Sequence, residues 1–556
     1  MKQTFKYTLI ALCSLTFAVG CIQETFPNTN YVTIDQAQVP GAADRFIDAV
    51  TTRLCGFPTV GGGTGANDFG YPRTFIEWDS MGQDFIQHNG ASGWFDNFYT
   101  IRNLGPTSAS SQYPWTLLYK AIKDCNSAIA SVGSEPTGSL KRGLGIALFY
   151  RAYFYLDLAQ MYANKPYYLD SKAETVPWID ETMVLEDYYE NPRLTSEALF
   201  TKILADLDKA EECLAGVKRA DKYTPDVSCV YGVKARAYLL MGKWAEAKDY
   251  AKKAQDGYTI MDKETYTSRE YGFNTPNEAW MLGLTFKSDN PCIQNNDADS
   301  CWGSWMCMEI NPVTSGCGYG SNYGYPMQID RHLYETIPAT DFRKNCFADF
   351  AIDEMSKADA LEALKAYTAH PDWIYSNNEG NGNPNGGTNF KFRPAGGEEG
   401  RNNQYIGFVM AVPMMRVEEM YLIEAEAAGR LNEAEGIELL TTFAKTRDEN
   451  YVYGTHNEAY FNTSTSAFVN EVWWQRRVEF WGEGLATKDI KRLQKGIIRS
   501  YPGTNHPETN RYNKETTPEW MNLCIVQTET NYNRAINTNN PEPLYPTTDS
   551  PEVDHF

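Results

Sequence analysis

Aromatic side chains interleaved with amides gather at two places in the sequence, and groups of this kind can bind a ligand. In chain order they are Trp94, Phe95, Asn97, Phe98, Trp302, Trp305, Tyr319, Asn322 and Tyr323. Rigid, flat rings lose few rotamers on binding, and amides supply hydrogen bonds. We expect the two groups to form one shallow binding platform. The alternative is that the rings fill the core, as Trp and Phe usually do.

Recognisable catalytic motifs are absent from the sequence. None of the six His residues lies in an H-E-x-x-H or G-x-S-x-G context. Pairs such as Glu418-Glu419 arise by chance among 71 acidic residues. The oxygen-rich stretch 295–299 lacks the Gly and final Glu of a calcium loop, which favours a solvated turn. We expect no catalytic residue, no metal site and no cofactor.

The elements that would position these groups are helical hairpins. Residues 230–254 contain two amphipathic stretches, with Val230, Val233, Ala237 and Leu240 on one face of the first. Gly242 separates the two stretches and can adopt the backbone angles that end a helix. The spacing is typical of a tetratricopeptide unit, which buries its apolar face only against neighbouring units.

Further helices of the same kind recur along the chain. Residues 421–447 repeat the scheme, with Gly429 predicted at the turn, and residues 144–162 carry a stripe of apolar side chains. Residues 194–214 form another amphipathic stretch, with Thr195 as the expected N-cap. The sequence therefore predicts an all-α fold built on a tetratricopeptide-like helical-repeat scaffold.

A long irregular segment interrupts this scaffold. Gly, Asn, Pro and aromatic residues dominate residues 257–412, where the helical period is largely lost. Irregular segments of this length are usually functional. We expect residues 41–256 and 413–556 to be the N-terminal and C-terminal helical parts, with 257–412 as a loop-rich insert.

The first residues have the pattern of an export signal. Lys2 and Lys6 precede an apolar run that ends before Cys21, and the run is too short to span a bilayer. Residues 18–21, Ala-Val-Gly-Cys, resemble a bacterial lipoprotein box. We expect residues 1–20 to be removed, Cys21 to be lipidated, and residues 21–40 to be a tether. Simple secretion is the alternative.

Charge and cysteine content restrict the partners further. The net charge of −21 argues against nucleic acid, whose phosphates would be repelled. Among the twelve Cys residues, Cys292, Cys301, Cys307 and Cys317 crowd the irregular segment. Outside the reducing cytosol these four could form disulfides.

Several stretches together resemble the SusD/RagB family of outer-membrane lipoproteins. They are RAYFYLDLAQMYANKPYY (151–168), VKARAYLLMGKWAEA (233–247), YETIPATDFR (334–343), MRVEEMYLIEAEA (415–427), RRVEFWGEGLATKDIKR (476–492) and NRAINTNNP (533–541). They occur in the family's order and cover most of the mature chain. Asp341 and Arg343 stand at family-typical positions, where we expect a structural ion pair.

The resemblance implies a surface-exposed, all-helical binding protein anchored to the outer membrane. Such proteins capture nutrient polymers, mostly glycans, and act as a lid on a TonB-dependent transporter of the SusC type. Aromatic faces stack on sugar rings, which suits the two aromatic groups of this chain. A peptide-binding lid, a helical-repeat adaptor that recruits a protein, and a helical glycoside hydrolase are the alternatives.

Overall fold

The computed structural model describes residues 42–56, 67–87, 94–133, 136–324, 326–348, 355–380, 387–547 and 550–555. Helix accounts for 49% and strand for 7% of the residues that it describes, so the predicted all-α class is confirmed. The signal, Cys21 and the tether lie outside the described residues. Among the helices that are described, none is both long enough and apolar enough to cross a membrane.

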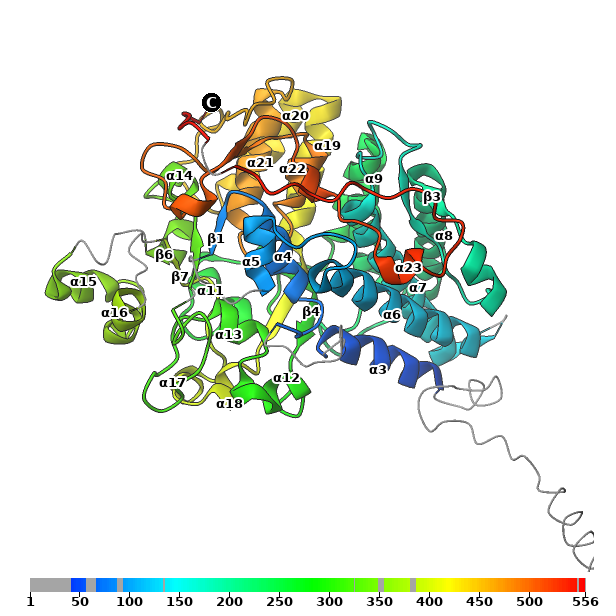
Figure 1. Cartoon of the computed structure of the whole chain (residues 1–556), viewed down its shortest axis with the longest axis horizontal. Helices are drawn as coiled ribbons and strands as arrows, with labels where there is room; N and C mark the ends of the chain where they lie inside the picture. The colour runs from blue at the N-terminus through cyan, green and yellow to red at the C-terminus, as the bar shows by residue number, and fades with distance from the viewer. Residues whose placement is uncertain are drawn as a thin grey trace, which may run out of the picture.

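Antiparallel helices form the scaffold, on the right and at the top of Figure 1. They are α6 (Ala109–Val132), α7 (Gly138–Tyr162), α8 (Ser196–Leu214), α9 (Val227–Met241), α10 (Trp244–Ala254), α19 (Val417–Leu431), α20 (Glu433–Ala444) and α21 (Ala467–Glu479). Each packs against its neighbour in this order, and α10 packs directly against α19. Helices far apart in the sequence thus form one continuous stack.

Two sequence-based assignments of helix ends are confirmed. Gly242 follows α9 with φ 71° and ψ 18°, the left-handed conformation, and its N–H donates to the carbonyl of Leu239 at 3.1 Å. The Thr195 hydroxyl accepts a hydrogen bond from the N–H of Ala198 at 3.2 Å at the start of α8. Local sequence therefore determines these boundaries.

The predicted turn at Gly429 is wrong. Gly429 lies inside α19, and the chain turns at Asn432 instead. A Cβ atom at Gly436 of α20 would lie 2.3 Å from the Gly429 Cα, and one at Gly429 would lie 2.0 Å from the Phe468 ring. The glycine is needed because two helices approach closely there, not because the helix ends.

Short strands connect the irregular segment to the scaffold. Strand β4 (Trp280–Thr285) pairs antiparallel with β8 (Ala411–Arg416), and β8 leads directly into α19. A second sheet has the order β1-β5-β7-β6, from Phe85–Gln87, Met327–Ile329, Thr388–Asn389 and Phe347–Ala348. Because β1 precedes the scaffold helices, this sheet ties the irregular segment to the N-terminal part.

Short helices complete the irregular segment and the ends of the chain. They are α3 (Ala42–Leu54), α4 (Arg73–Met81), α5 (Trp94–Thr100), α11 (Lys263–Tyr266), α12 (Pro291–Gln294), α13 (Trp302–Met306), α14 (Arg331–Thr336), α15 (Lys357–Leu364), α16 (Pro371–Gly380), α17 (Gly397–Arg401), α18 (Gln404–Gly407), α22 (Lys488–Arg492) and α23 (Gln527–Thr530). Helices α15 and α16 project at the left of Figure 1, α12, α17 and α18 lie at the lower edge of the globular part, and α13 lies above them.

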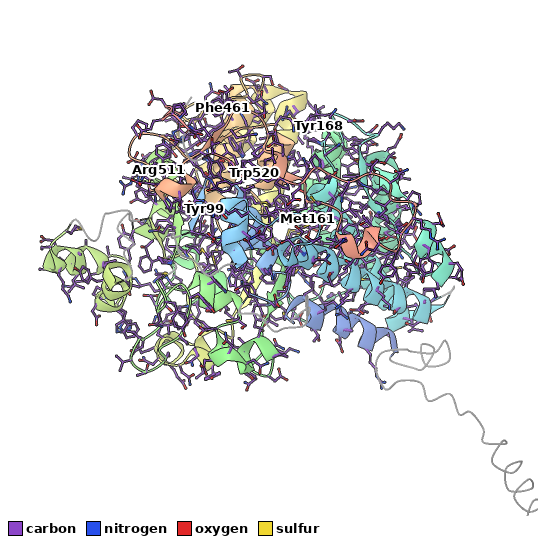
Figure 2. The ribbon with its side chains drawn as sticks, in the orientation of Figure 1. Tyr99, Met161, Tyr168, Phe461, Arg511 and Trp520 are labelled. Atoms are coloured by element: carbon purple, nitrogen blue, oxygen red, sulfur yellow. The ribbon has the colours of Figure 1, made fainter. Side chains whose placement is uncertain are left out.

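The C-terminal segment packs over the scaffold. The indole N–H of Trp520 donates to the carbonyl of Met81 at 3.0 Å, and the N–H of Leu523 donates to the carbonyl of Met161 at 2.9 Å (Figure 2). Trp520 is fully buried. Residues near the two ends of the chain therefore share one core.

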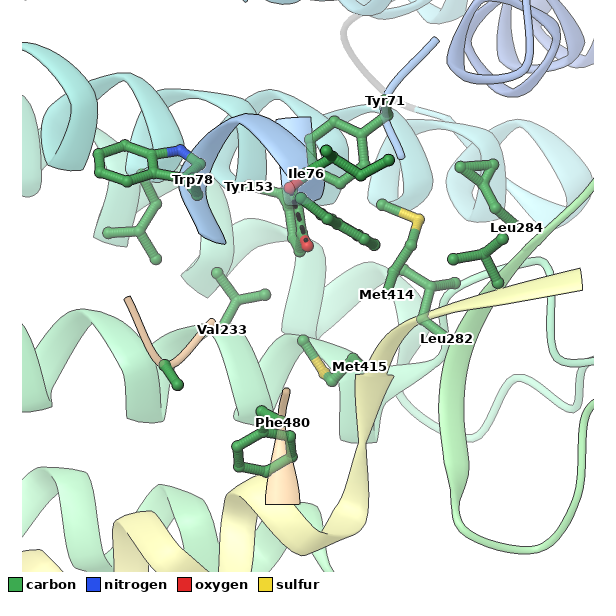
Figure 3. Close-up of a cluster of buried hydrophobic side chains, with 14 of the residues drawn as sticks. Tyr71, Ile76, Trp78, Tyr153, Val233, Leu282, Leu284, Met414, Met415 and Phe480 are labelled. Atoms are coloured by element: carbon green, nitrogen blue, oxygen red, sulfur yellow. Dashed lines mark hydrogen bonds between the residues drawn. The ribbon is translucent and has the colours of Figure 1, made fainter. Parts of the chain in front are cut away.

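That core is continuous from the scaffold into the strands. The hydroxyl groups of Tyr71 and Tyr153 are 3.2 Å apart, and Val233 lies in the same buried cluster as Leu282 and Met415 (Figure 3). Trp473, Trp474 and Trp481, which follow the helical period in the sequence, are also buried here.

A buried carboxylate, Glu479, joins the scaffold to the irregular segment. Its oxygens lie 3.2 Å from Arg343, 3.0 Å from Arg416 and 3.0 Å from Arg447, and Glu479 is fully buried. Burial alone would raise the pKa of this carboxyl group, but Arg447, Arg416 and Arg343 hold the pKa far below its usual range. Arg343 also pairs with Asp341 at 2.6 Å, so the expected structural ion pair is confirmed.

We expect Glu479→Gln to lower the free energy of unfolding by about 3–5 kcal/mol, because it removes a buried carboxylate that three buried arginines share. Urea unfolding followed by circular dichroism measures the change. Glu438→Gln, at an exposed position of α20, is the control and should change stability by less than about 0.5 kcal/mol. Equal midpoints for the two variants would contradict a role for Glu479 in stability.

The same pair of proteins tests the pH dependence. A carboxyl group whose pKa is depressed by folding stabilises the folded state above its unfolded pKa, about 4.3, and loses that contribution as the pH falls. The stability difference between wild type and Glu479→Gln should be constant from about pH 7 to pH 5.5. It should then shrink below about pH 4.3, by up to about 1.4 kcal/mol per pH unit. A difference that grows on acidification would contradict the assignment.

Candidate functional site

The first predicted aromatic group lies in and beside α5 and does not form a surface. Phe95 and Phe98 have no exposed area. Asn97 is half-buried and donates from Nδ2 to the Ser110 hydroxyl at 3.1 Å. The side chain of Trp94 lies outside the described residues.

The two tryptophans of the second group are also buried. Trp302 and Trp305 lie on α13 with no exposed area. The Trp305 ring packs edge-on against Phe95 at 4.9 Å between centroids, and Trp302 packs in the same way against Phe75 at 5.8 Å. The structure therefore brings the two groups together, as expected, but inside the protein.

Phe95, Phe98, Trp302 and Trp305 thus do not form the exposed platform that the sequence suggests. The alternative reading, in which the rings fill the core, is correct for these four. The physical reason is that α13 packs on α4 and α5, and glycines allow other backbone to cover it. A Cβ atom at Gly320 would lie 2.8 Å from the Trp305 carbonyl oxygen.

The remaining predicted residues do reach the surface. Tyr319 stacks on Trp305 with 4.2 Å between centroids and 3° between planes, and Tyr323 packs against Tyr319 at 5.3 Å. Tyr323 is 42% exposed, whereas Tyr319 and Asn322 are half-buried. The buried Trp305 ring thus supports the exposed Tyr323 ring through Tyr319.

Tyr405 and Asp297, which the sequence analysis did not name as site residues, complete this surface. Tyr405 on α18 is 40% exposed, and its hydroxyl lies 3.4 Å from a carboxylate oxygen of Asp297. The Thr314 hydroxyl donates to the Asn402 carbonyl at 3.0 Å. This hydrogen bond joins the loop before Tyr319 to the residues between α17 and α18. We call the tyrosine surface the set Tyr319, Asn322, Tyr323, Tyr405 and Asp297.

Carboxylates hold the exposed rings by their hydroxyl groups. The Tyr323 hydroxyl donates to Asp299 at 3.0 Å, and Asp299 also accepts hydrogen bonds from the Ser304 hydroxyl at 3.1 Å and the N–H of Gly318 at 2.5 Å. Burial raises the pKa of Asp299. The predicted solvated turn at residues 295–299 is therefore wrong for Asp299, which is an internal anchor.

The backbone that carries these carboxylates has an unusual conformation. Asn296, Asp297 and Ala298 have φ of 52°, 52° and 63°, in the left-handed region that non-glycine residues rarely adopt. No sequence pattern predicts that this turn and Tyr405 belong to one surface, because they are brought together by a contact between residues 108 positions apart. Three-dimensional packing alone reveals them.

The chemistry available here is that of binding. The tyrosine surface offers ring faces, an amide and a carboxylate. In the part of the chain that the structure describes, no group of three or more His, Cys, Asp or Glu is arranged to hold a metal ion. The thiols of Cys292, Cys301, Cys307 and Cys317 are free and buried, so the structure contains none of the disulfides considered among them.

Comparison with protein families gives two matches that follow one another along the chain. Residues 73–239 match a family described as starch-binding associating with outer membrane, and residues 313–549 match the SusD family. No match was found among curated protein sequences.

Solved structures share the fold along nearly the whole chain. A SusD-like carbohydrate binding protein from Bacteroides vulgatus is 20% identical with a TM-score of 0.67, and the match covers 92% of this chain and 98% of that one. Surface glycan-binding protein A from Bacteroides thetaiotaomicron, solved in complex with laminarihexaose, is 16% identical with a TM-score of 0.63 over 90% and 99%. The two family matches, over residues 73–239 and 313–549, establish that the chain belongs to the SusD family.

Proposed function

We propose that this protein is a cell-surface binding protein that captures oligosaccharides or polysaccharides and passes them to a TonB-dependent transporter of the SusC type. The observation that carries the proposal is the tyrosine surface, where Tyr323 and Tyr405 stand half-exposed with their hydroxyl groups held by Asp299 and Asp297. Rings fixed in this way lose little entropy when a ligand binds.

The chemistry of the surface suits a sugar. The apolar face of a pyranose ring stacks on an aromatic face, and its hydroxyl groups form hydrogen bonds with carboxylate and amide groups. The net charge of −21 favours a neutral glycan over a polyanionic one, because like charges repel. A solved relative named for glycan binding holds laminarihexaose, which supports a glycan over a peptide.

Attachment and delivery are parts of the same proposal. The lipoprotein-like box ending at Cys21 supports a lipid anchor, and one of the matching families is described as associating with the outer membrane. The SusC-type partner rests on the family resemblance. We propose binding without catalysis, because Asp297 of the tyrosine surface and Asp299 beneath it both pair with tyrosine hydroxyls, and the surface holds no nucleophile beside a base.

We expect Tyr323→Ala and Tyr405→Ala each to weaken glycan binding by about 1 kcal/mol or more, the lower end for stacking on a planar ring. Affinity electrophoresis in gels containing soluble starch, laminarin, xylan, mannan or pectin identifies the ligand, and isothermal titration then measures affinity. Tyr532→Ala is the control, because Tyr532 is 68% exposed and follows α23, far from α18 in Figure 1. Wild-type affinity in both test variants would place the site elsewhere.

The anchor is tested separately. We expect metabolic labelling with an alkyne-bearing fatty acid to mark the wild-type protein and not Cys21→Ala, because only the Cys21 thiol and the amino group exposed by cleavage would be acylated. Membrane fractionation of both proteins should show release of the variant. Equal labelling of the two would remove the lipid anchor from the proposal.

A further inference from the structure

A hollow lies beside an exposed tyrosine outside the tyrosine surface. It has a volume of about 430 Å³, within the range of small-molecule sites, and is open to solvent. Helix α11, the turn η2 (Gly272–Asn274) and the residues on either side of η2 line it. The side chains used below are Glu264, Ser268, Tyr271, Thr275 and Asn277.

Tyr271 stands at the edge of this hollow with 61% of its surface exposed. Its backbone is held, because its N–H donates to the Ser268 hydroxyl at 3.0 Å and its carbonyl accepts from the N–H of Asn274 at 3.2 Å. Gly272 follows with φ 50°, and a Cβ atom there would lie 3.2 Å from the Thr265 carbonyl oxygen. The backbone thus keeps a large ring in water, where it gains nothing from packing.

Hydrogen-bonding groups of both kinds surround this ring. The Ser268 hydroxyl accepts two backbone N–H groups, so its own proton can be donated to a ligand. The Thr275 hydroxyl donates to Asn274 at 2.7 Å and can still accept. Asn277 also lines the hollow, but its amide nitrogen is buried and its amide oxygen accepts a hydrogen bond from the N–H of Ala279 at 3.0 Å. Glu264 adds an exposed carboxylate.

One flat ring beside donors and acceptors at a hollow of this size matches a neutral, hydroxyl-rich ligand. We propose that the hollow at Tyr271 is a second carbohydrate-binding site, which rests on the proposed glycan-binding function. The ring would stack on a sugar face, while the Ser268 and Thr275 hydroxyl groups form hydrogen bonds with the hydroxyl groups of the sugar.

The hollow is connected to the tyrosine surface through α17. The Arg401 guanidinium at the end of α17 donates to the carbonyl of Arg269, two residues before Tyr271. Tyr405 lies on α18, which begins three residues after Arg401 and packs against α17. The two sites therefore flank the same pair of short helices. A polysaccharide that occupies both gains affinity from effective concentration, whereas a short oligosaccharide does not.

Tyr271→Ala tests the inference against the matched variants Tyr405→Ala and Tyr532→Ala. Each full-length protein is run in affinity gels of soluble starch, laminarin, xylan, mannan and pectin. The hexasaccharide of whichever polysaccharide retards the wild type is then titrated by calorimetry. Circular dichroism confirms that each variant is folded.

We expect Tyr271→Ala to weaken binding to the polysaccharide about 3–10-fold, while at least one hexasaccharide site keeps its wild-type affinity. Tyr532→Ala should bind the polysaccharide and the hexasaccharide with wild-type affinity. Calorimetry should also lose one hexasaccharide equivalent per protein in Tyr271→Ala. If Tyr271→Ala matches wild type with polymer and oligomer while Tyr405→Ala is impaired, the second site is overturned and the proposed function stands. If wild type is retarded by none of the five polysaccharides, the proposed function fails, and this inference fails with it.

Discussion

Burial of Glu479 among three arginines is the constraint on which the rest of the structure depends. Its partners come from separate parts of the chain, with Arg343 in the irregular segment, Arg416 at the end of β8 and Arg447 after α20. Removing any one of these charges from water is costly unless the others are already in place. The cluster therefore couples the scaffold and the irregular segment.

This coupling explains how a segment rich in Gly and Asn packs against the scaffold, in the part of it that the structure describes. Glu483 extends the cluster by pairing with Lys391 at 2.7 Å and with Arg416 at 2.9 Å, both buried. Large rings such as Trp302 and Trp305 are then enclosed between the segment and α4 and α5. Among the described residues of this segment, the aromatic rings that are exposed are those of Tyr271, Tyr323 and Tyr405. The hydroxyl group of a tyrosine tolerates water and can form hydrogen bonds with fixed partners.

The proposed function of the tyrosine surface depends on rigidity. Tyr323 rests on Tyr319, which stacks on buried Trp305, and Asp299 holds the Tyr323 hydroxyl from the other end. A binding surface built on the core in this way needs little reorganisation when a ligand arrives. Tyr271 is exposed for a similar reason, since hydrogen bonds on both sides of it hold its backbone. Family membership and these surfaces both support the proposed capture of a hydroxyl-rich polymer.

The sequence alone determines the helical scaffold and the family. Helical periodicity and capping are local, so the hairpin at Gly242, the N-cap at Thr195 and the buried positions of Trp473 and Trp481 can be predicted from neighbouring residues. Only the tertiary structure decides which aromatic rings face water. Trp305 and Tyr319 share the same glycine-rich surroundings in the sequence, yet Trp305 is covered by Phe95 from a distant helix while Tyr319 is partly exposed. Exposure depends on what packs against a side chain, and those contacts come from residues hundreds of positions away, which local sequence does not encode.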